Sequence, residues 1–239
     1  MEFLLVRVRF SWGFAARLQP QSKMRMAFKY PPPTTLLGAL AYPFIRRRGA
    51  GRLEVITKGK KVISAADKLK GLVKEVATSL HEEPSIYGSY LRVNRIYRKS
   101  LDFAVTAFPS SFVYSNEEGL ADLVYVMEEV SEDLERAAWG ITRIGSRESV
   151  VSVESVYVGE AIPKRGNSVK TRFSFSLRDY SVRGDGTILY VVDWRKQDIG
   201  DYAKADRIPY YYPKHEVEVS GNLSWFELKL PWGREVVIH

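Results

Sequence analysis

The stretch KYPPPTTLLGALAYPF, residues 29–44, joins a rigid segment to a helical pattern. Proline fixes its own backbone φ and disfavours a helical residue before it, so three prolines in a row hold the chain extended. Apolar side chains then recur at helical spacing, at Leu37, Leu40, Ala41 and Phe44. We therefore predict a helix from about residue 35, capped by Thr34 and bent or ended by Pro43.

The start of this helix is a candidate anion site. A helix N-terminus presents unpaired N–H groups and the positive end of the helix dipole, here beside the hydroxyls of Thr34 and Thr35. Lys29 precedes the prolines and Arg46 follows the apolar pattern. We also expect Gly38 to let the helix approach a neighbour closely. An ordinary capped core helix would show the same pattern, so both interpretations stay open.

Positive charge is concentrated in the first part of the chain. Residues 1–100 contain 20 Lys and Arg against 6 Asp and Glu, whereas residues 101–239 contain 16 against 22. Such asymmetry indicates a region that faces a polyanion, and the alternative is a lysine-rich solvated surface. Many of these cations are arginines that alternate with tyrosines, which favours nucleic acid.

Several function classes are excluded or disfavoured by composition. The chain has no cysteine, which excludes disulfides, thiolate zinc sites and cysteine nucleophiles. Its three histidines, His81, His215 and His239, have no partner at metal-ligand spacing, so we expect no metal and no other cofactor. No window approaches 18 uninterrupted apolar residues, so we expect a cytoplasmic protein that does not span a membrane.

Hydrophobic periodicity predicts an α+β fold for the first 160 residues. The predicted strands are 3–10, 86–99, 103–115, 120–130 and 150–160. The predicted helices are the one from about 35, another at 64–80, and a short one at 132–141 capped by Ser131. With 49–100 set aside as an insertion, the order is the ferredoxin-like βαββαβ, which RNA-recognition (RRM-like) modules share.

Residues 161–239 predict a small β-rich second domain. Glycine and proline punctuate short predicted strands at 171–177, 187–194, 215–219 and 234–238. We place the boundary at EAIPKRGN, which gives a first domain at 1–160 with its insertion at 49–100.

Two further segments combine the residue types that bind nucleic acid. In residues 86–99, tyrosines that could stack on bases alternate with Arg92, Arg95 and Arg98, although a solvated edge strand would look the same. In WGITRIGSRES, residues 139–149, glycines bracket Arg143 and could present N–H groups to a phosphate. A turn that ends a helix is the alternative for this second segment.

Metal-free RNA cleavage requires a base, an acid and a cation near the scissile phosphate. Lys214 and His215, which follow three tyrosines at 210–212, are the one cluster that contains these residue types. The alternative is a turn that leads into the strand predicted at 215–219.

The stretch PPPTTLLGALAYPF, followed about a hundred residues later by GITRIGSRESVVSVESVYVGEA, resembles the fifth-numbered family of CRISPR-associated proteins in the RAMP superfamily. The resemblance covers roughly residues 1–165 and is strongest to the archaeal type I-A branch. It implies a ferredoxin-like domain whose thumb comes from 86–114, plus a smaller β-domain. It also implies a Cascade subunit that grips the 5′ handle of CRISPR RNA, contacts the backbone-forming and large subunits, and meets target DNA through the complex.

One branch of that family, type I-C, cuts precursor CRISPR RNA itself. The chain resembles this branch at Tyr30, but it lacks a mid-chain lysine–histidine pair, since Lys214 and His215 lie in the C-terminal region. Two functions follow: a non-catalytic RNA-binding subunit, or a metal-independent endoribonuclease that uses Tyr30, Lys214 and His215. The candidate RNA contacts are Arg17, Lys23, Arg25, Lys29, Tyr30, Thr34, Thr35, Arg46, Arg92, Arg95, Arg98, Arg143, Ser146 and Arg147.

Overall fold

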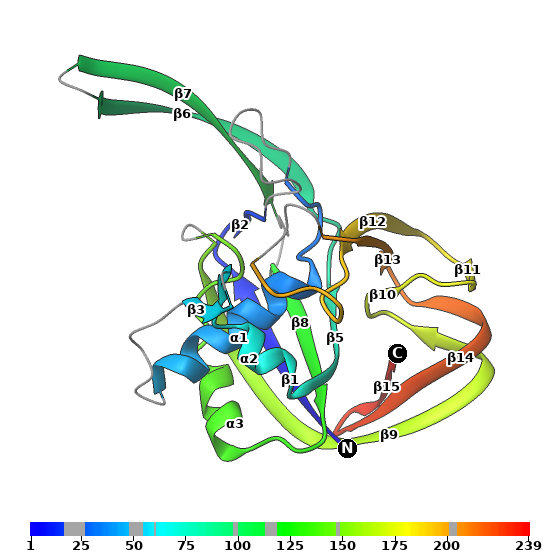
Figure 1. The fold of residues 1–239 in the computed structure, drawn as a ribbon. Helices are drawn as coiled ribbons and strands as arrows, with labels where there is room; N and C mark the ends of the chain where they lie inside the picture. The colour runs from blue at the N-terminus through cyan, green and yellow to red at the C-terminus, as the bar shows by residue number, and fades with distance from the viewer. Residues whose placement is uncertain are drawn as a thin grey trace.

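The computed structural model describes residues 1–16, 27–47, 55–59, 61–97, 100–112, 119–146, 149–200 and 205–239. In these ranges the protein is mostly β-structure, with few helices and a strongly curled main sheet (Figure 1). None of the described helices is both long enough and apolar enough to cross a membrane.

A seven-stranded antiparallel sheet organises the described part of the molecule, in the order β11-β14-β9-β1-β8-β5 with β15 on β14. Its strands are β1 Glu2–Phe10, β5 Val73–Leu80, β8 Leu120–Met127, β9 Val151–Thr171, β11 Ser181–Arg183, β14 Val217–Leu230 and β15 Gly233–Ile238. β1 lies between β8 and β9 and is buried on both faces, because Leu4 and Val6 join one apolar cluster while Phe3 and Leu5 join another. Continuous apolar runs are typical of strands that are covered on both sides.

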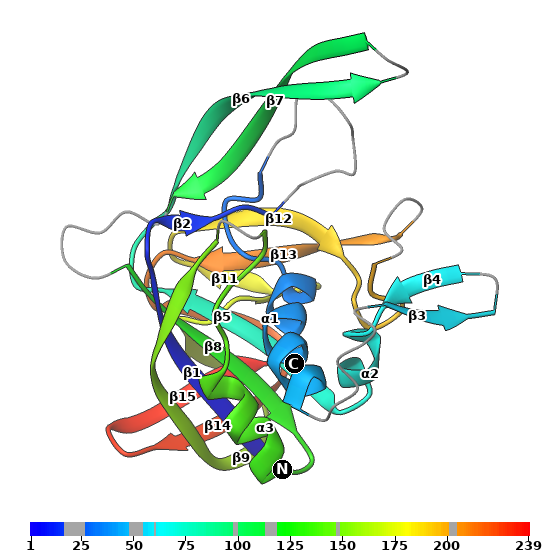
Figure 2. The same cartoon turned by 90° about the vertical axis from the view of Figure 1, so that its left-hand side faces the viewer.

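Two helices, α1 Pro33–Arg47 and α3 Glu132–Trp139, cover one face of this sheet (Figure 2). α3 begins as predicted, because Ser131 accepts a hydrogen bond from the N–H of Leu134. α1 differs from the prediction at its start. Thr34 is not its cap, since Pro33 is already helical and the carbonyl of Pro32 accepts the first bonds. Of the two alternatives predicted for Pro43, ending the helix is wrong, because Pro43 lies inside it.

The prediction of a helix at 64–80 is wrong. Only α2, Asp67–Lys70, is helical there, and β5 follows after Gly71. Lysines at helical spacing suggested a solvated helix face, but the β-branched residues Val73 and Val76 pack instead as part of a strand beside β8. The segment 49–100, predicted to be an insertion, therefore contains β5, a strand of the main sheet. The strand predicted at 103–115 does not belong to the main sheet.

That strand is β7, Ser100–Phe112, which pairs along its whole length with β6, Ser85–Tyr97. The two form a long hairpin that projects from the body (Figures 1 and 2). At about 3.3 Å per residue, thirteen residues span roughly 40 Å. Pro109 lies within β7, opposite Gly88 of β6. The short strand β2, Gly13–Phe14, pairs with Phe112 and Ser111 at the end of β7.

The C-terminal region is β-rich, as predicted. A three-stranded sheet has the order β10-β13-β12, with β10 Phe175–Ser176, β12 Gly186–Val192 and β13 Arg207–Pro213. A separate hairpin joins β3 Val55–Lys58 to β4 Lys61–Ser64. The predicted boundary segment is not a linker, because it lies within β9, which pairs with β1 up to Glu160 and with β14 from Ala161 onward.

A buried ion network joins the sheet strands near the hairpin. Asp122 on β8 is 0% exposed, and its carboxylate accepts hydrogen bonds from Arg7 at 2.8 and 3.0 Å and from Arg172 at 2.9 Å. The Nε2 atom of His81 lies 3.2 Å from the same carboxylate. Burial opposes ionisation, but the bonds from His81 and Arg7 and the charge of Arg172 outweigh it and hold the pKa of Asp122 well below its usual range.

We expect Asp122→Asn to lower the free energy of unfolding by about 3–5 kcal/mol, because it removes the fully buried charge that pairs with the partly buried guanidinium groups of Arg7 and Arg172. Arg172 keeps its second partner, Glu235, in this variant. Glu154→Gln is a control, since it breaks an exposed pair with Arg9 and should change the free energy of unfolding much less. The depressed pKa also means that the wild-type protein loses this contribution as the pH falls below about 4. Urea denaturation between pH 3 and 7 measures both effects, and equal costs for the two variants would contradict the network's importance.

Candidate nucleic-acid interface

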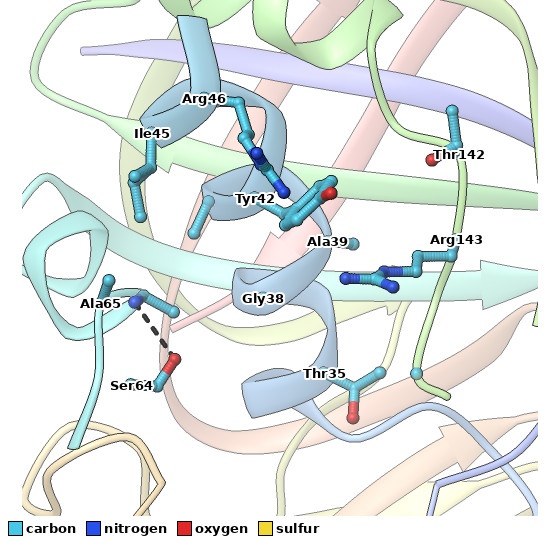
Figure 3. Close-up of a pocket in the computed structure, with 13 residues that line it drawn as sticks. Thr35, Gly38, Ala39, Tyr42, Ile45, Arg46, Ser64, Ala65, Thr142 and Arg143 are labelled. Carbon is cyan, nitrogen blue, oxygen red and sulfur yellow. Dashed lines mark hydrogen bonds between the residues drawn. The ribbon is translucent and has the colours of Figure 1, made fainter. Parts of the chain in front are cut away.

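A pocket of about 280 Å³ opens beside α1, where the two sequence segments singled out above meet (Figure 3). One wall is a face of α1, a second is the turn at residues 64–66, and a third is the segment from Thr142 to Gly145. These walls come from positions up to about 100 residues apart in the chain. The structure therefore brings together Thr35, Arg46 and Arg143, three of the predicted RNA contacts.

Tyr42 connects the two segments. The guanidinium of Arg143 lies over its ring at 4.4 Å from the centroid, and that of Arg46 lies at 5.3 Å. Cation–π attraction thus holds both cations at the pocket. Tyr42 was not among the predicted site residues, although Gly38, Tyr42 and Arg46 are spaced by four residues and so lie on one helix face.

Gly38 has a different role from the one predicted. A Cβ atom added there would meet no heavy atom within 4 Å, so the residue does not allow close packing of the helix. It faces the pocket instead, and the missing side chain keeps that wall open. Glycine inside a helix lowers helix stability by about 0.5–1 kcal/mol relative to alanine. No packing contact at Gly38 requires a glycine there.

The N-terminus of α1 offers fewer N–H groups than a typical helix start. Pro32 and Pro33 have none, and the N–H of Thr35 already donates to the carbonyl of Pro32 at 2.9 Å. Of residues 32–35, only Thr34 can therefore offer its N–H to an anion. Anion binding here has to come mainly from side chains, such as the hydroxyl of Thr35 at the pocket wall (Figure 3).

The turn that carries Arg143 is fixed against the segment at residue 15. The N–H of Ser146 donates to the carbonyl of Ala15 at 3.0 Å, and the N–H of Ala15 donates to the hydroxyl of buried Ser149 at 2.8 Å. Ser146, a predicted RNA contact, uses its hydroxyl in a 3.1 Å bond with Ser149. Gly145 has a φ of +101°, and a Cβ atom there would lie 2.7 Å from the carbonyl oxygen of Ala15.

A second cluster lies where the chain enters the proline segment. Lys29 and Lys214 both pair with the carboxylate of Glu83, and the Lys214 Nζ to Glu83 Oε2 distance is 2.9 Å. Beside them the ring of Tyr30 stacks on that of Tyr212 at 4.9 Å between centroids. Two residues of the alternative catalytic set, Tyr30 and Lys214, are thus brought near each other, while His215 is exposed on the adjoining turn.

The protonation states in this cluster favour cations over bases. Burial raises the pKa of Tyr30 to about 12, so its hydroxyl stays protonated at neutral pH. Its hydrogen bond to Glu83 raises the pKa of Lys214, which therefore stays charged. Hydrogen bonds from Lys29 and Lys214 lower the pKa of Glu83. The cluster supplies positive charge, and neither Tyr30 nor Lys214 is deprotonated to act as a base.

The remaining predicted contacts are placed only in part. Arg92 and Arg95 lie on β6, opposite Val105 and Asp102 of β7 in the hairpin register, and only their backbone is described. Five others lie outside the described residues: Arg17, Lys23, Arg25, Arg98 and Arg147. In the described part of the chain, no group of three His, Asp or Glu residues is arranged to hold a metal ion.

Comparison with known proteins extends this picture, although no protein-family model matches the chain. The CRISPR system aCascade subunit Cas5 1 of Saccharolobus solfataricus is 32% identical over 204 residues, which cover 82% of this chain and 81% of the relative. The chain belongs to the Cas5 family of CRISPR-associated proteins. A second Cas5 protein of that organism, CRISPR-associated protein Cas5 3, is 31% identical over the same shares of the two chains.

Solved structures agree with the Cas5 assignment at the level of fold. A CRISPR protein from Archaeoglobus fulgidus superposes with a TM-score of 0.64 at 24% identity and covers 100% of this chain and 98% of its own. A chain of a CRISPR RNA-guided surveillance complex superposes with a TM-score of 0.51 at 13% identity, covering 89% and 90%. The resemblance stated from the two sequence motifs is thereby confirmed for this Cas5 protein.

We expect Gly145→Ala to lower the free energy of unfolding by about 2–4 kcal/mol, because a left-handed residue gains a side chain that collides with a backbone carbonyl. Gly59→Ala is the matched control, since Gly59 has a φ of +61° but no atom within 4 Å of an added Cβ. That variant should lower the free energy of unfolding by only about 1–2 kcal/mol. Denaturation curves of both proteins check the difference, and a cheaper change at Gly145 would contradict the docked turn.

Proposed function

We propose that this Cas5 protein is a non-catalytic subunit of a type I Cascade complex that binds CRISPR RNA at its 5′ handle. The pocket at α1 is the observation that carries the proposal. It combines Arg46, Arg143 and the hydroxyl of Thr35 with a glycine that no packing contact requires. Such a site suits a phosphate-bearing ligand, because guanidinium groups pair with phosphate oxygens through several donors.

The relatives and the topology support this function. The most similar curated relative reported above carries the name of an aCascade subunit, and one similar fold comes from an RNA-guided complex. The order β1-α1-β5-β8-α3-β9, with sheet neighbours β9-β1-β8-β5, supports assigning residues 1–160 to a ferredoxin-like domain. In that assignment the β6–β7 hairpin is the thumb inserted after β5, and residues 161–239 are the smaller β-rich domain.

The proposed partners are the RNA handle, the backbone-forming subunit, the large subunit and, through the complex, target DNA. The projecting hairpin supports a role in assembly, because a two-stranded arm this long extends well beyond the body of the subunit (Figure 1). Arg92 and Arg95 on β6 would contribute phosphate contacts along it.

One observation favours a second function, a metal-independent endoribonuclease. Tyr30 and Lys214 converge around Glu83 although 184 positions separate them in the chain, and His215 follows directly. The protonated states of Tyr30 and Lys214 leave the base to His215. The non-catalytic function remains the preferred one.

Gly38 provides the main test of the binding function. Gly38→Ala should raise the free energy of unfolding by about 0.5–1 kcal/mol through helix propensity, whereas Gly38→Leu should fill the pocket and weaken binding of repeat RNA at least about tenfold. Gly71→Ala is the control, because Gly71 has helical φ and ψ values and does not line the pocket. Melting and RNA-binding titrations should be run on the same samples. Unchanged affinity in a well-folded Gly38→Leu variant would remove the pocket from the interface.

Cleavage separates the two functions. We expect no cutting when the purified protein is incubated with labelled repeat RNA and EDTA, because the described cluster holds protonated groups and no activated base. Cutting at one defined site that His215→Ala abolishes and Tyr30→Phe slows would establish the endoribonuclease instead. Tyr30→Phe is suited to this test, because it keeps the ring that stacks on Tyr212 and removes only the hydroxyl.

A further inference from the structure

Two lysines converge on one carboxylate where the hairpin joins the body. Lys29 precedes the proline segment, Lys214 directly follows β13, and Glu83 lies in the turn between β5 and β6. The Nζ atom of Lys29 donates to Glu83 Oε1, and that of Lys214 donates to Oε2 at 2.9 Å. The three side chains are 25%, 36% and 39% exposed for Lys29, Lys214 and Glu83, so solvent and ligands can reach them.

The backbones that carry the two lysines are held together without Glu83. Tyr30, next to Lys29, stacks on Tyr212, two residues before Lys214. The hydroxyl of Tyr212 donates to the carbonyl of Pro31 at 3.3 Å, and the N–H of Lys214 donates to the carbonyl of Asp185 at 2.9 Å. The lysines would therefore stay close to each other if the carboxylate left.

A phosphodiester matches the group that now lies between these lysines. Its two non-bridging oxygens share one negative charge, as the two oxygens of a carboxylate do, and each can accept a hydrogen bond from an ammonium group. Exchange would leave the pair of cations with one anion, so the local charge would be unchanged. Exposed ion pairs contribute little to stability, so release of Glu83 is not costly.

The position of this cluster connects it to the RNA-binding surface. β6, with Arg92 and Arg95, begins two residues after Glu83, and α1 begins four residues after Lys29. The cluster thus lies between the hairpin and the helix that forms the pocket wall. A strand of RNA that contacts both would pass near it.

We propose that Lys29 and Lys214 form a binding site for one backbone phosphodiester of RNA, and that Glu83 fills this site until RNA displaces it. Glu83 then lowers RNA affinity by competing with phosphate. This inference rests on the RNA-binding function proposed above and adds a site and a competing residue to it.

The test measures the affinity of the full-length protein for labelled single-stranded repeat RNA and for a random RNA of equal length at several salt concentrations. Glu83→Gln should bind both RNAs about threefold to tenfold tighter, because it removes the competing charge and keeps the size of the side chain. In a Lys29→Met, Lys214→Met background, Glu83→Gln should change affinity by less than about twofold, and that background should itself bind more weakly. Glu160→Gln is the control, since Glu160 pairs with Lys229 at 2.7 Å on an exposed surface of β9.

The possible results separate the inference from the function on which it rests. If Glu83→Gln binds RNA no more tightly than wild type, or more weakly, while Gly38→Leu impairs binding, Glu83 is a structural ion-pair partner and the inference is wrong. If tightening persists in the double-methionine background, the lysines are not the site and the inference is again wrong. If the wild-type protein shows no salt-dependent RNA binding, both the function and the inference are wrong. Melting temperatures of every variant show that differences in affinity are measured on folded protein.

Discussion

Contact between the proline segment and the C-terminal region sets the position of the start of α1 at the candidate interface. Tyr212 of β13 stacks on Tyr30 and donates to the carbonyl of Pro31, a residue 181 positions earlier in the chain. Because the three prolines leave the backbone little freedom, fixing Pro31 fixes the direction in which α1 begins. The same contact positions the side chain of Lys29. It also positions the face of α1 that carries Gly38 and Tyr42. The β-rich C-terminal region is therefore part of the interface's support.

Parts of the fold were predictable where the signal is local. β1, β8, the start of β9 and α3 follow from alternation, helical spacing and the Ser131 cap, and each of them is where the pattern placed it. β5 was missed because Lys74 continues the helical spacing of Lys68 and Lys70 in α2, and because the identity of the strand depends on pairing with β8, about 45 residues later in the chain. The predicted domain boundary at residues 160–167 lies within β9, which continues through these residues and changes its partner strand there.

For the candidate site, the sequence predicted some of the residues but not how they are arranged. Arg46, Arg143 and Thr35 were identified by residue type, but Tyr42, which holds the two arginines, became visible only when the segments met. The pairing of Glu83 with Lys29 and Lys214 joins three distant segments, and no sequence period reports such a contact. The sequence singled out Gly38 as a glycine in a helix interior, but it took the structure to show that no neighbour packs against it and that it faces the pocket.

The chemistry of these groups bears on what kind of recognition they can provide. At the start of α1, Pro32 and Pro33 have no N–H group and the N–H of Thr35 is already bonded, so the attraction for an anion there comes mainly from ammonium, guanidinium and hydroxyl groups. Lysine and arginine contacts to phosphates fix the position of a nucleic acid but do not read its bases. Tyr42, the aromatic residue at the pocket, already has two guanidinium groups over its ring, which leaves less of the ring for a base. Under the proposed function, the described surface would hold an RNA backbone in place, and discrimination between RNA sequences would require groups beyond this pocket.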